Sequence, residues 1–151
     1  MSTMLPGNDT ARAWMKLFRV QGMLSEQVEA DLKEARLPPA TWYDVLVQLR
    51  DAGQGGISQQ ALADALVLPK HTVSRLMDRF ETRGLVYRKS HPTDGRMTLV
   101  ILKPEGQMVL KDMWAVYGKR IEAILGEALD LREQRRLLQV LERIERTLHA
   151  T

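Results

Sequence analysis

The chain has 151 residues, of which 44% are apolar, and this is enough for one domain with a substantial core. It contains no cysteine, which excludes disulfides, thiolate nucleophiles, thiol redox sensing and cysteine-ligated metal sites. The net charge is only +3, no stretch approaches the roughly 18 uninterrupted apolar residues that cross a bilayer, and residues 1–7 lack the pattern of a signal peptide. We therefore expect a cytoplasmic protein that does not contact membranes.

The first predicted element is a long helix over residues 10–36. Apolar side chains recur along it at spacings of three and four, which places them on one face of the helix: Trp14, Leu17, Phe18, Leu24, Val28 and Leu32. The helix is expected to end at Leu37-Pro38-Pro39.

A second helix follows, and Thr41 with Asp44 three residues later has the pattern of a capping box at its start. Its expected buried face consists of Trp42, Val45, Leu46 and Leu49. The glycines at positions 53, 55 and 56 end it. No Gly-Lys-Ser/Thr follows them and no apolar strand precedes them, so they indicate a turn and not a phosphate-binding loop.

Two further helices and a hairpin are predicted next. Ile57 is expected to be extended, Ser58 to cap a short helix, and Pro69 to occupy the first position of another helix that ends at Gly84. Their buried positions are predicted to be Leu62, Leu66, Val73, Leu76, Met77 and Phe80. Two β-favouring runs, 85–89 and 97–103, flank turn residues and predict a hairpin with a polar, basic tip.

The C-terminal third of the chain is predicted to be helical. A long helix starts at Pro104 and is interrupted near Asp130, and a final helix runs from Leu131 to His149 with its apolar residues on one stripe.

Positive charge is concentrated in the segment from Pro69 to Lys103. This segment has eight Lys or Arg against three Asp or Glu, a local charge of +5, whereas the rest of the chain carries −2. Such a distribution is typical of a surface that contacts nucleic acid. Charge alone leaves open a solvated face with scattered arginines.

The order of elements decides between these alternatives. A short helix, a turn, a longer helix and a hairpin within about 45 residues form the arrangement of a winged helix-turn-helix, in which the second helix enters the major groove and the hairpin reaches a neighbouring minor groove. The fold class is therefore expected to be mainly α with a small β-hairpin wing.

Candidate DNA contacts follow from the helix phase. The residues near the start of the recognition helix are expected to meet base edges: Lys70, His71, Thr72, Ser74 and Arg75, of which Arg75 can hold guanine bidentately. Three others are expected to neutralise phosphates: Arg79, Arg88 and Lys89. Arg96 at the hairpin tip is expected to enter the minor groove, with Asp94 orienting it.

These residues resemble the multiple-antibiotic-resistance-regulator (MarR) family of winged-helix regulators over the run from Ser58 to Gly106. The matching motifs are Leu62-Ala63, Thr72-Val73-Ser74-Arg75-Leu76, Asp78-Arg79, Arg83-Gly84-Leu85-Val86 with Arg88, and Asp94-x-Arg96. One departure is that Leu102-Lys103-Pro104-Glu105-Gly106 replaces the family's Leu-Thr-x-x-Gly, so the threonine cap is lost and proline takes the first helical position.

The resemblance implies a single domain over residues 1–151. It comprises a winged helix-turn-helix at about 40–103 and an all-helical dimerisation lobe formed by helices at about 10–36 and 104–149. It further implies a homodimer on a pseudo-palindromic double-stranded operator, with recognition helices about 34 to 36 Å apart. A small aromatic or phenolic anion is expected to bind near Phe18, Trp42, Tyr43 and Trp114 and to release the DNA. The resemblance also implies that the DNA-bound protein represses transcription.

Plainer interpretations remain open for several of these residues. Phe18, Trp42 and Trp114 could serve as ordinary core packing, since aromatic residues at helical spacing usually fill cores. His71 and His91 lack partners for a metal site, and no cofactor is expected. No catalytic triad, HExxH or nucleotide-binding loop suggests an enzyme, but an architectural DNA-binding dimer without an effector stays an alternative.

Overall fold

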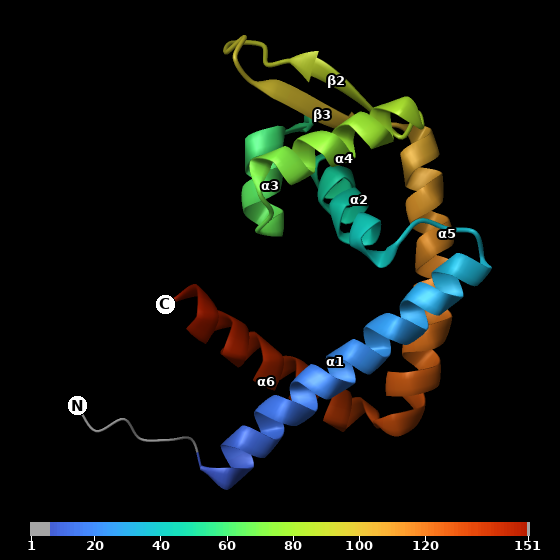
Figure 1. Cartoon of the computed structure of the whole chain (residues 1–151), viewed down its shortest axis with the longest axis vertical. Helices are drawn as coiled ribbons and strands as arrows, with labels where there is room; N and C mark the ends of the chain where they lie inside the picture. Colours follow the sequence, from blue (N-terminus) through green and yellow to red (C-terminus); the bar gives the residue numbers. More distant parts are fainter. Residues whose placement is uncertain (1–6, 151) are drawn as a thin grey trace. The chain divides into compact units, whose positions relative to one another are not determined.

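A computed structural model describes residues 7–150 (Figure 1). In chain order the elements are α1 (Asn8–Glu34), α2 (Ala40–Ala52), a 3-10 turn (Gly53–Gly55), β1 (Ile57–Ser58), α3 (Gln59–Leu66), α4 (Lys70–Thr82), β2 (Val86–Ser90), β3 (Thr98–Leu102), α5 (Pro104–Ile121), a π-helical turn (Glu122–Gly126) and α6 (Leu131–His149). The predicted fold class, mainly helical with a hairpin wing, is confirmed. In the described part of the chain no helix combines the length and the hydropathy needed to cross a bilayer.

The chain separates into two compact units that meet within α5, between Trp114 and Ala115. The first unit contains α1 to β3 and the start of α5, and the second contains the end of α5, the π-helical turn and α6. The first unit therefore includes α1 and the first turns of α5, which the resemblance assigns to a dimerisation lobe, together with the helix-turn-helix elements and the hairpin.

The sheet has three antiparallel strands in the order β1-β3-β2. The expected hairpin pairs Arg88 with Val100 and Lys89 with Leu99, and on the other side of β3 the short strand β1 pairs Ile57 with the same Val100. Figure 1 shows the β2–β3 hairpin projecting beyond the helices. Four consecutive buried residues make β3 the centre of the sheet: Leu99, Val100, Ile101 and Leu102.

The core of the first unit lies between α2, α4 and β3. The predicted inner face of α2 is buried, and α4 buries Val73, Met77 and Phe80, with Leu76 half-buried. The rings of Trp42 and Phe80 pack with their centroids 4.6 Å apart. Each fully buried side chain of this size contributes about 1.5–3 kcal/mol relative to exposure, so this contact fixes the rotation of α4 about its axis.

Three helices end in the same way, with a residue in the left-handed conformation. Arg36 follows α1 with φ +59°, Val67 follows α3 with φ +53° and Gly84 follows α4 with φ +72°. The next residue in each case donates its amide to a carbonyl five residues back, at 2.8 Å after α1, 3.0 Å after α3 and 2.8 Å after α4. This is the Schellman motif, in which glycine is favoured. The predicted helix end at Gly84 is confirmed, and here glycine takes the left-handed position.

The helix starts confirm some predicted caps and correct others. The Ser58 hydroxyl accepts the amide of Ala61 at 3.1 Å, as predicted. The capping box of Thr41 and Asp44 is wrong, because α2 already begins at Ala40 and its amide donates to Glu29 Oε1 on α1 at 2.8 Å. Pro69 is the residue before α4 and not its first residue.

The start of α6 carries a capping box that the sequence did not identify. Asp130 Oδ1 accepts the Glu133 amide at 2.8 Å, and Glu133 Oε2 accepts the Asp130 amide at 2.9 Å. The predicted interruption at Asp130 is confirmed.

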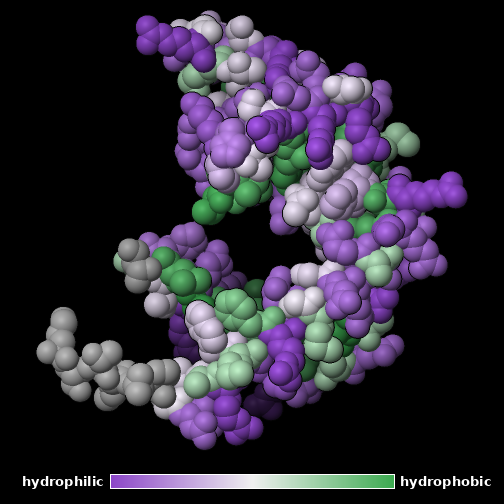
Figure 2. All heavy atoms as spheres, in the orientation of Figure 1, coloured by the Kyte–Doolittle hydropathy of each residue, from purple (hydrophilic) through white to green (hydrophobic). Residues whose placement is uncertain are grey.

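Two helices expose the apolar stripes that the sequence assigned to them. On α1 only Leu32 is buried, whereas Trp14 is 65% and Phe18 62% exposed. Figure 2 shows pale and green side chains along α1. No residue of α6 is buried, and its exposed apolar residues recur at helical spacing: Leu131, Leu137, Leu138, Leu141, Ile144 and Leu148. Both stripes are surfaces that a single chain leaves uncovered.

Candidate nucleic-acid interface and ligand cavity

The outer face of α4 carries the predicted base-reading residues. Because the buried residues at 73, 77 and 80 face the core, Lys70, His71, Arg75 and Arg79 are exposed, and Thr72 and Ser74 are half-buried. Pro69 accepts the amides of Thr72 and Val73 at 3.0 and 3.2 Å, which fixes the first turn. The geometry therefore presents a polar, mostly basic helix face to solvent.

The wing tip is held by side chains that accept main-chain amides. The His91 Nδ1 accepts the amides of Thr93 at 3.2 Å and Asp94 at 3.1 Å. Asp94 Oδ1 accepts the amide of Arg96 at 3.0 Å. Asp94 thus orients Arg96 through the main chain, and His91 has a structural role in the tip that the sequence did not reveal.

The sequence predicts a phosphate contact for Arg88, but in the structure its side chain packs against α4. Its side chain is only 24% exposed, and Nη2 lies 2.7 Å from Asp78 Oδ1. Nε lies 3.5 Å from Glu81 Oε2, and Nη2 also donates to the Ser74 carbonyl at 3.4 Å. Arg88 therefore ties β2 to three residues of α4, while its neighbour Lys89 is exposed.

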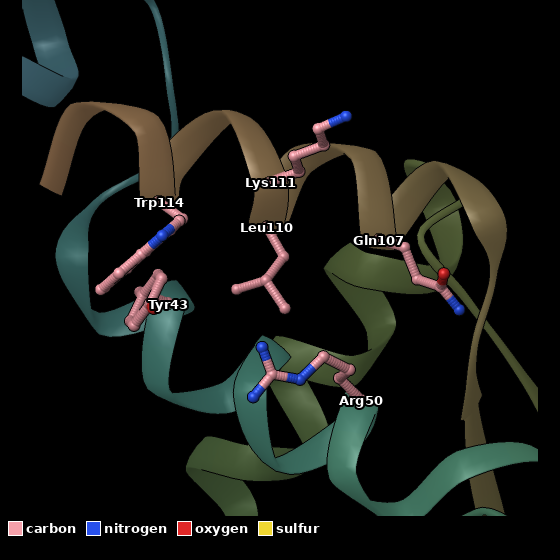
Figure 3. A pocket seen from close by; sticks show the side chains of 6 residues that line it. All are labelled: Tyr43, Arg50, Gln107, Leu110, Lys111 and Trp114. Carbon is pink, nitrogen blue, oxygen red and sulfur yellow. The ribbon is translucent and has the colours of Figure 1, made fainter. Parts of the chain in front are cut away.

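A cavity of about 490 Å³ lies between α2 and α5 within the first unit (Figure 3). Its lining consists of Tyr43, Arg50, Gln107, Leu110, Lys111 and Trp114. The rings of Tyr43 and Trp114 stack with centroids 6.2 Å apart. In Figure 3 the Arg50 guanidinium points toward Leu110, whereas the Lys111 ammonium points away from the cavity.

Two electrostatic features bear on what this cavity can bind. Burial raises the pKa of the Tyr43 phenol, Arg50 lowers it, and Asp44 adds to the rise, so the phenol remains a hydrogen-bond donor at neutral pH. Arg50 pairs with Asp51 at 3.1 Å, but both side chains are more than half exposed, so the pair is weak and Arg50 can turn to another anion.

The structure brings together two of the four residues that were predicted to bind an effector, Tyr43 and Trp114. Trp42 lies in the core against Phe80, with the Arg83 guanidinium 5.0 Å from its ring. Phe18 is on the exposed face of α1, 5.1 Å from Trp14. Core packing is therefore the role of Trp42.

The polar lining of the cavity was missed, although its spacing is visible in the sequence. Arg50 follows Tyr43 by seven residues on α2, and the lining residues of α5 stand at positions 107, 110, 111 and 114, all of which are one-face spacings. Within residues 7–150 no three His, Asp or Glu side chains gather as metal ligands.

Comparisons with known proteins agree with this geometry. Residues 37–97 match the profile of the MarR family. Transcriptional regulator HosA of Escherichia coli O111:H- is 33% identical over 108 residues, which cover 72% of this chain and 79% of HosA.

Solved structures have the same fold. The structure of Sco3205, a MarR family transcriptional regulator from Streptomyces coelicolor in complex with DNA, has a TM-score of 0.86 at 20% identity and covers 97% of this chain and 92% of its own. CouR from Rhodococcus jostii RHA1 bound to p-coumaroyl-CoA has a TM-score of 0.70 at 28% identity and covers 85% and 87%. The curated relatives are regulators, in agreement with the expectation that this protein is not an enzyme. The chain belongs to the MarR family of transcriptional regulators.

Proposed function

We propose that the protein is a homodimeric repressor that binds a pseudo-palindromic operator and is released from it by a small aromatic anion. The observation that carries the proposal is the outer face of α4, which exposes Lys70, His71, Arg75 and Arg79 while Phe80 and its neighbours lock the inner face. A rigid helix with a basic outer face beside a hairpin is the geometry of major-groove readers.

Within this proposal the residues of the interface divide by role. Arg75 reads a base, because its exposed fork can hold guanine O6 and N7, a contact worth about 1–3 kcal/mol of discrimination. His71, Thr72 and Ser74 assist it at base edges or phosphates. Arg79 and Lys89 neutralise phosphates. Arg88 holds α4 against the sheet.

The dimer rests on the exposed stripes of α1 and α6. Large apolar side chains such as Trp14, Phe18 and Leu138 are more than half exposed in one chain. A second copy that covers them would give each operator half-site its own α4, about 34 to 36 Å from the other.

Selection of bound sequences from a random duplex pool tests the operator. We expect a palindrome with half-sites one helical turn apart. In the selected operator, Arg75→Lys keeps the charge but lacks the bidentate fork, so it should lose discrimination at one base pair per half-site while binding to random duplex changes little. Equal losses on both duplexes would contradict base reading, and selection of no sequence would contradict the whole proposal.

The cavity between α2 and α5 (Figure 3) supports the proposal that the protein binds a small effector. A planar ring can stack beside Tyr43 and Trp114, and a carboxylate or phenolate can pair with Arg50. Isothermal titration measures the affinity for a panel of aromatic acids. Operator binding in the presence of each acid then shows whether the acid releases the DNA. Arg50→Gln should weaken binding of the acid about tenfold, the loss of one charge-assisted contact. Lys111→Gln, whose ammonium points away, is the matched control.

An architectural dimer without an effector is the second candidate. It would show no heat with any aromatic acid and no loss of operator affinity in their presence.

A further inference from the structure

His91 closes the turn at the tip of the wing through one ring nitrogen. Nδ1 accepts the amides of Thr93 at 3.2 Å and Asp94 at 3.1 Å, and the Thr93 hydroxyl lies 3.2 Å from the same atom. The His91 side chain is half-buried, whereas residues 92–98 are exposed. His91 is therefore the side chain around which the tip folds, and it acts there as a hydrogen-bond acceptor.

Short polar side chains usually fill this acceptor role. Asn, Asp and Ser accept amides that lie two or three residues ahead of them in turns and helix caps, and their oxygen remains an acceptor near neutral pH. Histidine differs from them, because its charge changes between about pH 5 and 8. A histidine at this position makes the closed turn depend on the protonation of one ring.

The contacts determine which form of the ring the closed turn requires. A ring nitrogen that accepts an amide carries no proton, so the neutral His91 ring has its proton on Nε2. In the imidazolium both ring nitrogens are donors, and a proton on Nδ1 would point at two amide protons. Protonation therefore removes both hydrogen bonds and leaves the two amides without their acceptor.

The charged residues around the tip do not compensate for this loss. They are Lys70 at the start of α4, Lys89 on β2, and Asp94 and Arg96 in the tip itself. Three of the four are cations, which repel a further positive charge. The carboxylate of Asp94 already accepts the Arg96 amide at 3.0 Å. An imidazolium in the closed turn would thus lose two contacts and meet a surplus of positive charge.

We propose that His91 makes the wing tip sensitive to pH, closed while the ring is neutral and open when the ring is protonated. The strands below the tip stay paired, since Ser90 pairs with Thr98 and the His91 amide donates to the Met97 carbonyl at 2.9 Å. Opening is therefore confined to residues 92–96. Its effect on DNA rests on the proposed function: an open tip must be ordered again when the operator binds, so acid weakens operator binding.

NMR spectroscopy of the free full-length protein tests the tip without DNA. At about pH 7.5 we expect the neutral His91 ring to carry its proton on Nε2, and the Thr93 and Asp94 amide resonances to move together with the ring as the pH falls to about 5.5. His91→Asn places an acceptor at the same number of bonds from Cβ but does not titrate, so both amides should keep their closed positions. His91→Ala has no acceptor and should show the open tip at both pH values.

The matched control is His149→Gln, which removes an exposed histidine that pairs with Glu145 outside the wing. In this variant the Thr93 and Asp94 resonances should move as they do in the wild-type protein. Amides that move equally in the wild-type protein and in His91→Asn, or a neutral His91 ring with its proton on Nδ1, would overturn the proposal.

Operator affinity, measured by fluorescence anisotropy on the selected operator, is the functional readout. Between about pH 7.5 and 5.5 the wild-type protein should lose about threefold more affinity than His91→Asn, which corresponds to one neutral hydrogen bond. Both proteins retain His71 on α4, so its protonation cancels in the comparison. An equal or smaller loss in the wild-type protein would overturn the effect on DNA. A protein that binds no duplex at any pH would overturn the proposed function, while the NMR transition of the free tip would remain.

Discussion

Val67 has the left-handed conformation at the end of α3 although it is β-branched, and its replacement by glycine should stabilise the protein. Its φ is +53°, and it occupies the same position of a Schellman motif as Gly84 after α4. A β-branched residue in this region is a genuine conformational outlier. We expect Val67→Gly to relieve the strain without disturbing the turn.

The expected magnitude follows from three terms. Left-handed strain in a non-glycine residue costs about 1–3 kcal/mol. Glycine costs about 0.5–1 kcal/mol in unfolded-chain entropy. Val67 is 86% exposed, so its lost burial costs only about 0.3 kcal/mol. The net gain is about 1 kcal/mol, which corresponds to a rise in Tm of about 2–4 °C.

Thermal unfolding followed by circular dichroism, at one fixed protomer concentration, measures this gain. Two controls isolate the backbone term. Val67→Ala removes the branch but keeps the Cβ, so it should recover only part of the gain. Gly84→Ala introduces a left-handed alanine where nothing lies within 4 Å of the new Cβ, and it should lower Tm. A Val67→Gly protein that melts at or below the wild-type temperature would refute the reasoning.

Three further predictions concern other elements. Arg88→Met removes the ion pairs that join β2 to α4, so it should cost about 1 kcal/mol of stability and weaken operator binding. It should leave the slope of log Kobs against log salt unchanged, whereas Lys89→Met should lower that slope by about 0.9. Gly106→Ala should destabilise by about 1–3 kcal/mol, because a Cβ there would lie 2.5 Å from the Leu85 carbonyl oxygen. Asp130→Ala should cost about 1 kcal/mol by removing the cap of α6.

Each of these has a distinguishing control. A reduced salt slope for Arg88→Met would show that it contacts phosphate after all. Gly118→Ala, at an open position of α5, should be tolerated in urea unfolding, and an equal effect of both glycine substitutions would contradict the close packing at Gly106. Asp130→Asn can still accept the Glu133 amide, so it should unfold like the wild type if the cap is responsible.

Most of the fold could be predicted because it depends on local patterns. The apolar spacing of 73, 77 and 80 set the phase of α4. This phase identified Lys70, His71, Arg75 and Arg79 as exposed, although Thr72 and Ser74 are half-buried. Turn residues placed the hairpin, and Gly84 marked a helix end that the structure confirms. These features require only neighbours within a few turns of chain.

The features that could not be predicted depend on distant residues. Nothing near Arg88 in the sequence shows that Asp78 and Glu81 surround it, because their approach follows from packing β2 on α4. The four aromatic residues did not form one site for a different, local reason: Trp42 and Tyr43 are adjacent on α2, so they point to different sides of the helix.

The carboxylate of Glu29, which accepts the first amide of α2 at 2.8 Å, has a consequence for assembly. The helix that begins the DNA-reading lobe is completed by a residue of α1, and the exposed stripe of α1 is where we expect the second subunit. In the proposed dimer, a second subunit packed on the exposed stripe of α1 would also hold Glu29 beside the Ala40 amide at the start of α2. We therefore expect the start of α2 to be less firmly held in a single protomer than in the proposed dimer.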